Sequence, residues 1–288
     1  MPELIAATLL WALSFGLIKH QLAGVDPNLV AWARLALALP VLLPFLRWRE
    51  LSLWSGRPER RALGLLAIGA VQYGLMYTGY LTAFRHAEGH QIALFTVTTP
   101  LYVCLVHDAW ARRVDPVNLL LAGLAVVGAV VLQPRSWSLG AAWPGFLLVQ
   151  ASNLCFAFGQ VAYRRMRREA PAVRDRAVFA WLYLGGLLVC TLTVSAGRGW
   201  GGLATLTGAQ VWTLLYLGVV ASGLGFFLWN RGAVKVTPGA LAVLNNLKIP
   251  LAVAAALTIF GEVADLRRLA LGGGIMLVAA ALAGRRSR

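Results

Sequence analysis

Charged side chains are scarce in this chain of 288 residues: Asp, Glu, Lys and Arg together make up only 13% of it. A soluble globular domain carries about 25%. Acidic residues are the scarcest, with 11 Asp and Glu against 26 Lys and Arg. The three cysteines, Cys104, Cys155 and Cys190, lie inside apolar segments, so they predict no disulfide framework. This composition excludes an ordinary water-soluble domain.

Long apolar runs take the place of the missing charge. Hydrophobic residues make up 59% of the chain, and the mean hydropathy is +0.70. The first run is a poor signal peptide, because it opens on Glu3 and ends at Lys19 and His20. A helix crosses a bilayer with about 20 residues. We therefore predict an all-α membrane protein of ten transmembrane helices, over residues 3–19, 28–46, 63–84, 89–107, 117–133, 141–163, 177–197, 209–230, 238–259 and 268–284.

The basic residues are distributed unevenly between the predicted loops. If the N-terminus is inside, 18 Lys and Arg fall in inner loops and 6 in outer loops. Inner loops of membrane proteins carry such an excess. We therefore predict an integral protein of the inner (plasma) membrane with both termini cytoplasmic. The net charge of +15 is then an orientation signal, and the lipid bilayer, not a nucleic acid, is the expected partner.

Two segments of the chain occur twice. Residues 88–132 align without a gap with residues 238–282, so that Pro100 corresponds to Pro250. A second stretch, 65–75, aligns with 214–224. We predict two five-helix halves, residues 1–135 and 136–288. Because five is an odd number of crossings, the second half would be inverted in the membrane, as in many secondary transporters. Since one chain supplies both halves, we expect a functional monomer.

Several strings in the second half carry a family resemblance: Asn230-Arg231-Gly232-Ala233, Pro238-Gly239-Ala240, Leu244-Asn245, Pro250-Leu251-Ala252, Phe260-Gly261-Glu262 and Gly272-Gly273-Gly274. With them the chain resembles the drug/metabolite transporter superfamily, in its ten-helix form with two EamA-type repeats. The first half departs from the pattern, with Ala111-Arg112 in place of Gly261-Glu262. The resemblance implies a transporter of small solutes. Within the superfamily, the chain broadly resembles amino-acid exporters of the YddG type.

Two cations fall inside predicted spans. Lys248 is ten residues into its span, about 15 Å deep at about 1.5 Å per residue, and Arg34 lies nearer the outer face. Charges at membrane depth are functional candidates by default. All 11 acidic residues lie in loops or at span ends, so Lys248 has no predicted anionic partner. We interpret it as the group that meets a substrate carboxylate, without cation symport. The alternative is a structural lysine bonded to carbonyls freed by Pro250.

Polar and aromatic residues in neighbouring spans complete the predicted substrate site. Such a lining suits a zwitterionic amino acid with an apolar or aromatic side chain. The alternative for each residue is helix packing, since amides and hydroxyls also bond between membrane helices. With Lys248, the predicted substrate-binding residues are Trp11, Ser14, Gln72, Tyr73, Tyr77, Thr98, Tyr102, Asn153, Gln160, Asn245 and Asn246.

Pro100 and Pro250 are predicted hinges, because each removes a backbone donor in mid-helix and frees a carbonyl four residues earlier. A purely steric kink is the alternative. Competing classes of function fit poorly. An embedded enzyme would need a nucleophile or metal cluster, and a retinal-type receptor an acidic counter-ion at depth. We predict no catalytic residue, metal or cofactor; drug-like cations and nucleotide or sugar derivatives are the alternative cargo.

Overall fold

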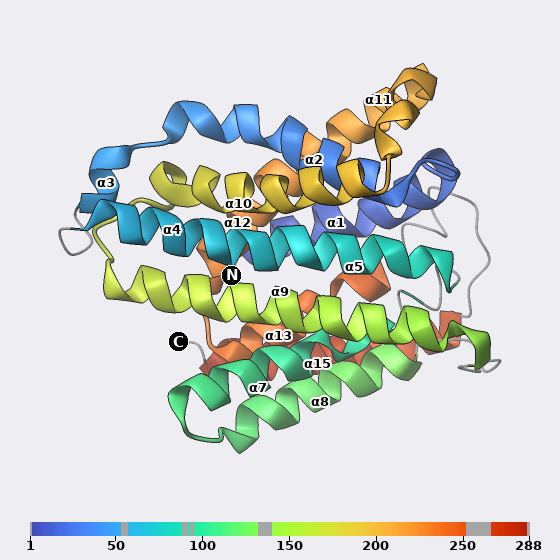
Figure 1. Ribbon diagram of the computed structural model, residues 1–288. Helices are drawn as coiled ribbons and strands as arrows, with labels where there is room; N and C mark the ends of the chain where they lie inside the picture. Colours follow the sequence, from blue (N-terminus) through green and yellow to red (C-terminus); the bar gives the residue numbers. More distant parts are fainter. Residues whose placement is uncertain are drawn as a thin grey trace.

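The computed structural model describes residues 2–52, 57–87, 92, 95–131, 140–251 and 266–286. They form a bundle of helices that run roughly along one common axis (Figure 1). The α-helices are α1 Pro2–Gln21, α2 Pro27–Leu42, α3 Trp48–Ser52, α4 Pro58–Gly69, α5 Met76–Thr82, α7 Thr99–Ala111, α8 Pro116–Val131, α9 Trp143–Glu169, α10 Asp175–Ala196, α11 Gly208–Leu215, α12 Gly225–Ala233, α13 Pro238–Asn246 and α15 Leu266–Arg286. Short 3-10 segments are η1 Leu43–Phe45, η3 Ala83–Arg85, η4 Thr96–Thr98, η5 Gly140–Ala142 and η6 Gly199–Thr205. Within the described ranges, two segments are π-helical, η2 Ala70–Leu75 and η7 Tyr216–Leu224.

The bundle has the polarity of a membrane protein. Large apolar side chains face outward, among them Leu63, Leu120 and Leu188, which are 67%, 63% and 62% exposed. Polar side chains such as Gln72 and Asn230 are fully buried inside. Water would penalise this arrangement, whereas lipid favours it. Among the described residues, five continuous helical stretches are long and apolar enough to cross a membrane: Pro27–Phe45, Pro58–Thr82, Trp143–Glu169, Asp175–Ala196 and Gly208–Ala233.

The parts of the chain from the two predicted halves pack against each other throughout the bundle. Helix α10 packs on α2, α4 and η2, while α13 and α15 pack on α8. The helix α9 that opens the second half runs in the opposite direction to α1 (Figure 1). The predicted boundary between residues 135 and 136 lies outside the described residues, as do parts of the fourth and ninth predicted spans. The count of ten helices therefore remains a prediction.

One end of the bundle collects the loops that the charge pattern assigns to the inside. Helix α3, the turn between α7 and α8 and the turn between α9 and α10 all lie at this end, on the left in Figure 1. Hydrogen bonds join the two halves there. Arg174 in the α9–α10 turn donates from Nε to Glu50 of α3 over 2.8 Å. The burial of Glu50 would raise the pKa of its carboxyl, but the hydrogen bonds from Arg174 outweigh it and lower that pKa.

The repeated sequence produces repeated irregularities of the backbone. The π-helical segments η2 and η7 occupy matching positions, since residues 65–75 align with 214–224. The two repeated prolines also lie at breaks. Pro100 is the second residue of α7, directly after η4, and α13 ends at Asn246, four residues before Pro250. The Thr96 carbonyl that Pro100 deprives of a donor accepts the Thr99 hydroxyl at 2.6 Å instead.

Candidate substrate site

A pocket opens between the helices of both halves, close to the two helix breaks. Its described walls come from α1, α2, α5, η4, α7, α9, α12 and the segment after α13. It holds about 730 Å³ of empty space, part of it at the open mouth. Volumes of about 300–1,000 Å³ with mostly apolar walls are typical of small-molecule sites. The lining is Trp11, Ser14, Ile18, Arg34, Met76, Tyr77, Tyr80, Thr96, Thr99, Ser152, Asn153, Phe156, Phe226 and Lys248.

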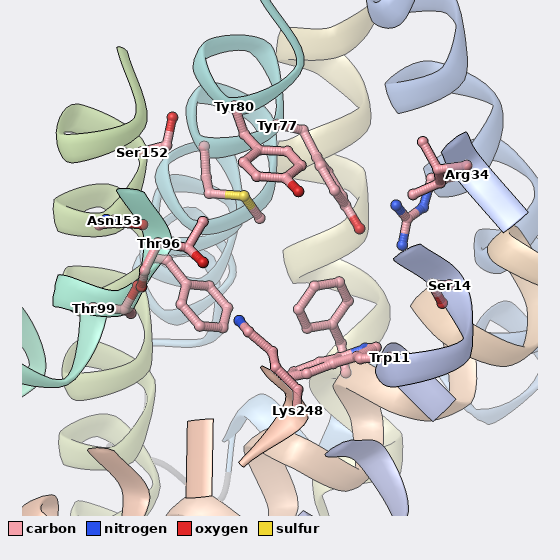
Figure 2. A pocket seen from close by; sticks show the side chains of 14 residues that line it. Trp11, Ser14, Arg34, Tyr77, Tyr80, Thr96, Thr99, Ser152, Asn153 and Lys248 are labelled. Carbon is pink, nitrogen blue, oxygen red and sulfur yellow. The ribbon is translucent and has the colours of Figure 1, made fainter. Parts of the chain in front are cut away.

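Lys248 projects into this pocket from below in Figure 2, with its amino group on the side of Thr96 and Thr99. Among the described residues, its Nζ has no hydrogen-bond partner. The described lining also contains no Asp or Glu. The amino group is therefore available to an anion that enters the pocket. A carboxylate is the common biological group that fits such a point charge.

Aromatic side chains form the wall around α1. The Trp11 indole donates from Nε1 to the Ala221 carbonyl of η7 at 2.9 Å, which fixes its ring. Its centroid lies 4.8 Å from that of Phe226 and 4.9 Å from that of Trp229. Ser14 lies one turn further along α1, in the same lining. Trp11, Ser14 and Tyr77 are thus predicted site residues that the structure places in the pocket.

Asn153 is the fifth predicted residue in the lining, and it also holds the break before α7. Its Nδ2 donates to the Phe95 carbonyl at 2.9 Å, and Gln150 Nε2 donates to the same oxygen at 3.0 Å. Thr98 donates to Gln150 Oε1 at 2.6 Å, so its hydroxyl faces α9 and lies outside the pocket lining. Thr96 and Thr99 line the pocket in its place.

The other predicted residues lie away from the pocket. Gln72, Tyr73 and Asn230 form a buried network: Asn230 donates to the Tyr73 hydroxyl at 2.7 Å and accepts from Gln72 Nε2 at 3.2 Å. Asn246 donates to the Val97 carbonyl at 2.8 Å. Three further predicted residues also lie outside the lining: Tyr102 packs against the main core, and the amides of Gln160 and Asn245 are fully buried without a hydrogen-bond partner in the described structure.

Arg34 is a pocket-lining residue that the predicted list left out. Asp26 caps α2 by accepting from the amides of Asn28 and Leu29, and so fixes the start of the helix that carries Arg34. Arg34 is 5% exposed and lines the pocket. The signal was present, since Arg34 is a charge inside a predicted span. Thr96, Thr99 and Ser152 were also missed; each neighbours a polar residue that was predicted.

A pocket with two basic side chains and a mostly apolar wall, inside a lipid-facing bundle, is typical of membrane proteins that bind or move small molecules. A family model described as the EamA-like transporter family matches residues 4–133 and again residues 143–285. The chain belongs to the EamA-like transporter family, within the drug/metabolite transporter superfamily. The double match confirms the duplication.

Curated relatives cover nearly the whole chain. The "Probable biotin transporter" of Pseudomonas aeruginosa is 38% identical over 281 residues, which cover 96% of this chain and 95% of the relative. The "Biotin transporter" of Escherichia coli is 40% identical over 253 residues, with coverage of 87% and 81%. The "Probable amino-acid metabolite efflux pump" of Salmonella typhimurium is 25% identical, with coverage of 96% and 91%.

A solved crystal structure supports the fold. It superposes with a TM-score of 0.74 at 21% identity and covers 99% of this chain and 97% of that one. At this identity the likeness extends to the fold alone. Family membership and these relatives identify the chain as a secondary transporter of a small metabolite. It is an integral membrane protein, and the enzyme alternative is excluded.

Proposed function

We propose that this chain transports biotin. The observation that carries the proposal is the 38–40% identity to biotin transporters over nearly the full chain. The pocket supports it chemically. Biotin has a carboxylate at one end, an apolar chain in the middle and a fused ring system with a neutral ureido group at the other end. An ammonium, aromatic walls and a few hydroxyl and amide groups suit such a molecule.

Lys248 holds the biotin carboxylate in this proposal. Its ammonium has no partner among the described residues, so the ion pair would cost no existing protein contact. Removing its charge would leave the carboxylate in a partly dry pocket without a counter-charge, which is costly. Trp11, Phe156 and Phe226 would cover the apolar chain and ring faces.

Transport would proceed by alternating access between two inverted five-helix halves, with both termini in the cytoplasm. Three observations support this proposal: the duplicated family match, the opposite directions of α1 and α9, and a pocket that draws residues from both halves. The gathering of basic loops at one end of the bundle supports a cytoplasmic location for that end. Pro100 and Pro250 would serve as the hinges.

Amino-acid export is the second candidate function. Its support is the 25% identity to an amino-acid metabolite efflux pump over nearly the full chain. A zwitterion would present its carboxylate to Lys248 as biotin does. It would also bring an ammonium, for which the described lining offers hydroxyl and amide oxygens but no carboxylate.

Counterflow in proteoliposomes tests the two candidates. Vesicles loaded with unlabelled biotin should accumulate radiolabelled biotin. An excess of unlabelled external biotin should reduce this uptake, whereas an excess of leucine or phenylalanine should not. Lys248→Gln should reduce biotin flux at least about tenfold, the equivalent of about 1.4 kcal/mol. Arg60→Gln is the matched control, since Arg60 is an exposed basic residue far from the pocket lining.

Biotin flux that persists in Lys248→Gln at the level of Arg60→Gln would contradict the role of Lys248. Wild-type vesicles that exchange amino acids and ignore biotin would overturn the proposed cargo and favour the second candidate.

A further inference from the structure

The guanidinium of Arg34 is held on two sides by the protein. Its Nε donates to the Ser222 hydroxyl of η7 at 3.0 Å. Its Cζ lies 4.8 Å from the centroid of the Tyr77 ring, a cation–π distance. Tyr77 in turn places its hydroxyl 3.4 Å from that of Ser222. These contacts fix the plane of the guanidinium and occupy one of its three nitrogens.

The two terminal nitrogens of Arg34 remain free to donate. Neither has a hydrogen-bond partner within the described part of the chain, although the residue is 5% exposed and lines the pocket. A guanidinium donates five N–H bonds and accepts none. A buried site with unused donors is complementary to a ligand that carries an acceptor at that place.

The described lining of the pocket therefore contains two basic side chains, which lie in separate walls. Arg34 enters from α2 beside Tyr77, and Lys248 enters from the segment after α13, well apart from it in Figure 2. Because they are apart, one small carboxylate cannot engage both. With no Asp or Glu in the described lining, the pocket favours a molecule with acceptors at both ends and repels a positive charge at either end.

We propose that Arg34 is a second ligand-binding residue, which donates to the ureido carbonyl of biotin and excludes molecules that carry an ammonium at that position. This inference rests on the proposed function and specifies the selectivity of the same pocket. Lys248 has no partner among the described residues and is available to the carboxylate. Ser222 and the Tyr77 ring hold the Arg34 guanidinium, and its two terminal nitrogens keep N–H donors that a neutral carbonyl oxygen can accept.

A pair of matched ligands separates the two roles. Desthiobiotin has the carboxylate and the ureido ring, and 7,8-diaminononanoate is the same skeleton without the ureido carbonyl, so it presents two amines. Competition against radiolabelled biotin on purified full-length protein gives the affinity of each. Wild type should bind desthiobiotin at least about tenfold more tightly than the diamine, a difference of about 1.4 kcal/mol. A wild-type ratio near one would overturn the inference without any variant.

Three variants complete the test. Arg34→Gln should weaken desthiobiotin and shrink the ratio towards one, whereas Lys248→Gln should weaken both ligands and leave the ratio unchanged. Arg34→Lys keeps the positive charge and should still exclude the diamine. This variant replaces Arg34→Gln in the test if the glutamine variant does not fold. Equal weakening of both ligands in Arg34→Gln would assign Arg34 a structural role and overturn the inference. If the ratio changes in Lys248→Gln and not in Arg34→Gln, then Lys248 contacts the ureido end of the ligand. That result would also overturn the inference.

Failure of the proposed function gives a different result. Biotin would be refuted as the cargo if wild-type protein bound neither biotin nor desthiobiotin and if Lys248→Gln behaved like wild type.

Discussion

Neighbouring residues around the end of α13 have different tasks. Lys248 faces the pocket without a described partner, whereas Asn246, two residues earlier, is fully buried and bonded to the protein. Its amide donates to the carbonyl of Val97, inside the 3-10 segment η4. That hydrogen bond joins the broken helix of one half to the broken helix of the other. Of these two neighbouring polar residues, Lys248 faces the pocket and Asn246 bonds to the protein scaffold.

The substitution Asn246→Ala tests the scaffold role. It removes the donor to a buried carbonyl, and an unsatisfied buried group costs about 1–3 kcal/mol. We expect a lower unfolding temperature in detergent, with the affinity of the folded fraction for biotin unchanged. Asn245→Ala is the control, because the amide of Asn245 has no hydrogen-bond partner in the described structure. A loss of biotin affinity at unchanged stability would instead place Asn246 in the binding site.

At the scale of the helix, close contacts between backbones hold α4 against α10. A Cβ built on Gly69 would lie 1.8 Å from the Leu182 carbonyl oxygen, and one built on Gly185 would lie 1.9 Å from that of Leu66. Only glycine permits this approach. Small residues allow membrane helices to pack where lipid supplies no hydrophobic driving force. The contact joins the predicted first half to the second.

Gly185→Ala should therefore force α4 and α10 apart. Overpacking of a tight interior costs about 1–3 kcal/mol, so the unfolding temperature and the monodisperse fraction in detergent should both fall. Gly123→Ala in α8 is the matched control, since its Cβ would meet nothing within 4 Å. That substitution should be neutral or slightly stabilising, as alanine is the better helix former. Equal behaviour of the two variants would show that the contact contributes nothing to stability.

The sequence predicted the positions of the helices and their breaks better than it predicted which side chains of each helix line the pocket. The repeated prolines, the apolar spans and the deep Lys248 follow from residue spacing, and the family match confirms the duplication. Tyr73 and Tyr77 of the third span were both predicted to contact the substrate. In the structure, Tyr73 joins the network with Asn230, while Tyr77 and Tyr80 line the pocket. The π-helical segment η2 contains Tyr73 and ends before Tyr77, so it changes the register between them.

A second change of register explains the threonines. Thr98 was predicted to face the substrate, but it closes the 3-10 segment η4 and bonds to Gln150. A 3-10 turn has three residues per turn instead of 3.6, so the face that lines the pocket passes to Thr96 and Thr99. Neither the π-helical nor the 3-10 segment has a sequence signature that composition or periodicity would reveal. Five of the predicted residues, Trp11, Ser14, Tyr77, Asn153 and Lys248, therefore line the pocket, and their role in substrate binding stays a prediction.

Over the whole molecule, the irregular segments of both halves converge on the pocket. Tyr77 follows η2 and Phe226 follows η7, and these two aromatic residues are partners in the repeat, with ring centroids 6.2 Å apart. The helix breaks of the two halves meet where Asn246 bonds to Val97. Helix irregularities in membranes occur where protein or water satisfies the backbone. The duplicated architecture thus places two similar backbone distortions around one pocket, while side chains that differ between the repeats, such as Lys248 and Thr98, give the two halves different polar groups.

The charge distribution of the pocket also predicts how transport is driven. Proton- or sodium-coupled carriers commonly bind the ion through a carboxylate at membrane depth, and the described lining has none. We expect imposed pH or Na⁺ gradients to drive little biotin accumulation in proteoliposomes, while a biotin gradient drives exchange at full rate. Valinomycin with a K⁺ gradient provides the control for membrane potential, because net movement of a monoanion is electrogenic even without a coupling ion. The prediction is wrong if biotin accumulates uphill along the pH or Na⁺ gradient at zero membrane potential. Such coupling would require an ion-binding group, which the two basic side chains of the described lining do not provide.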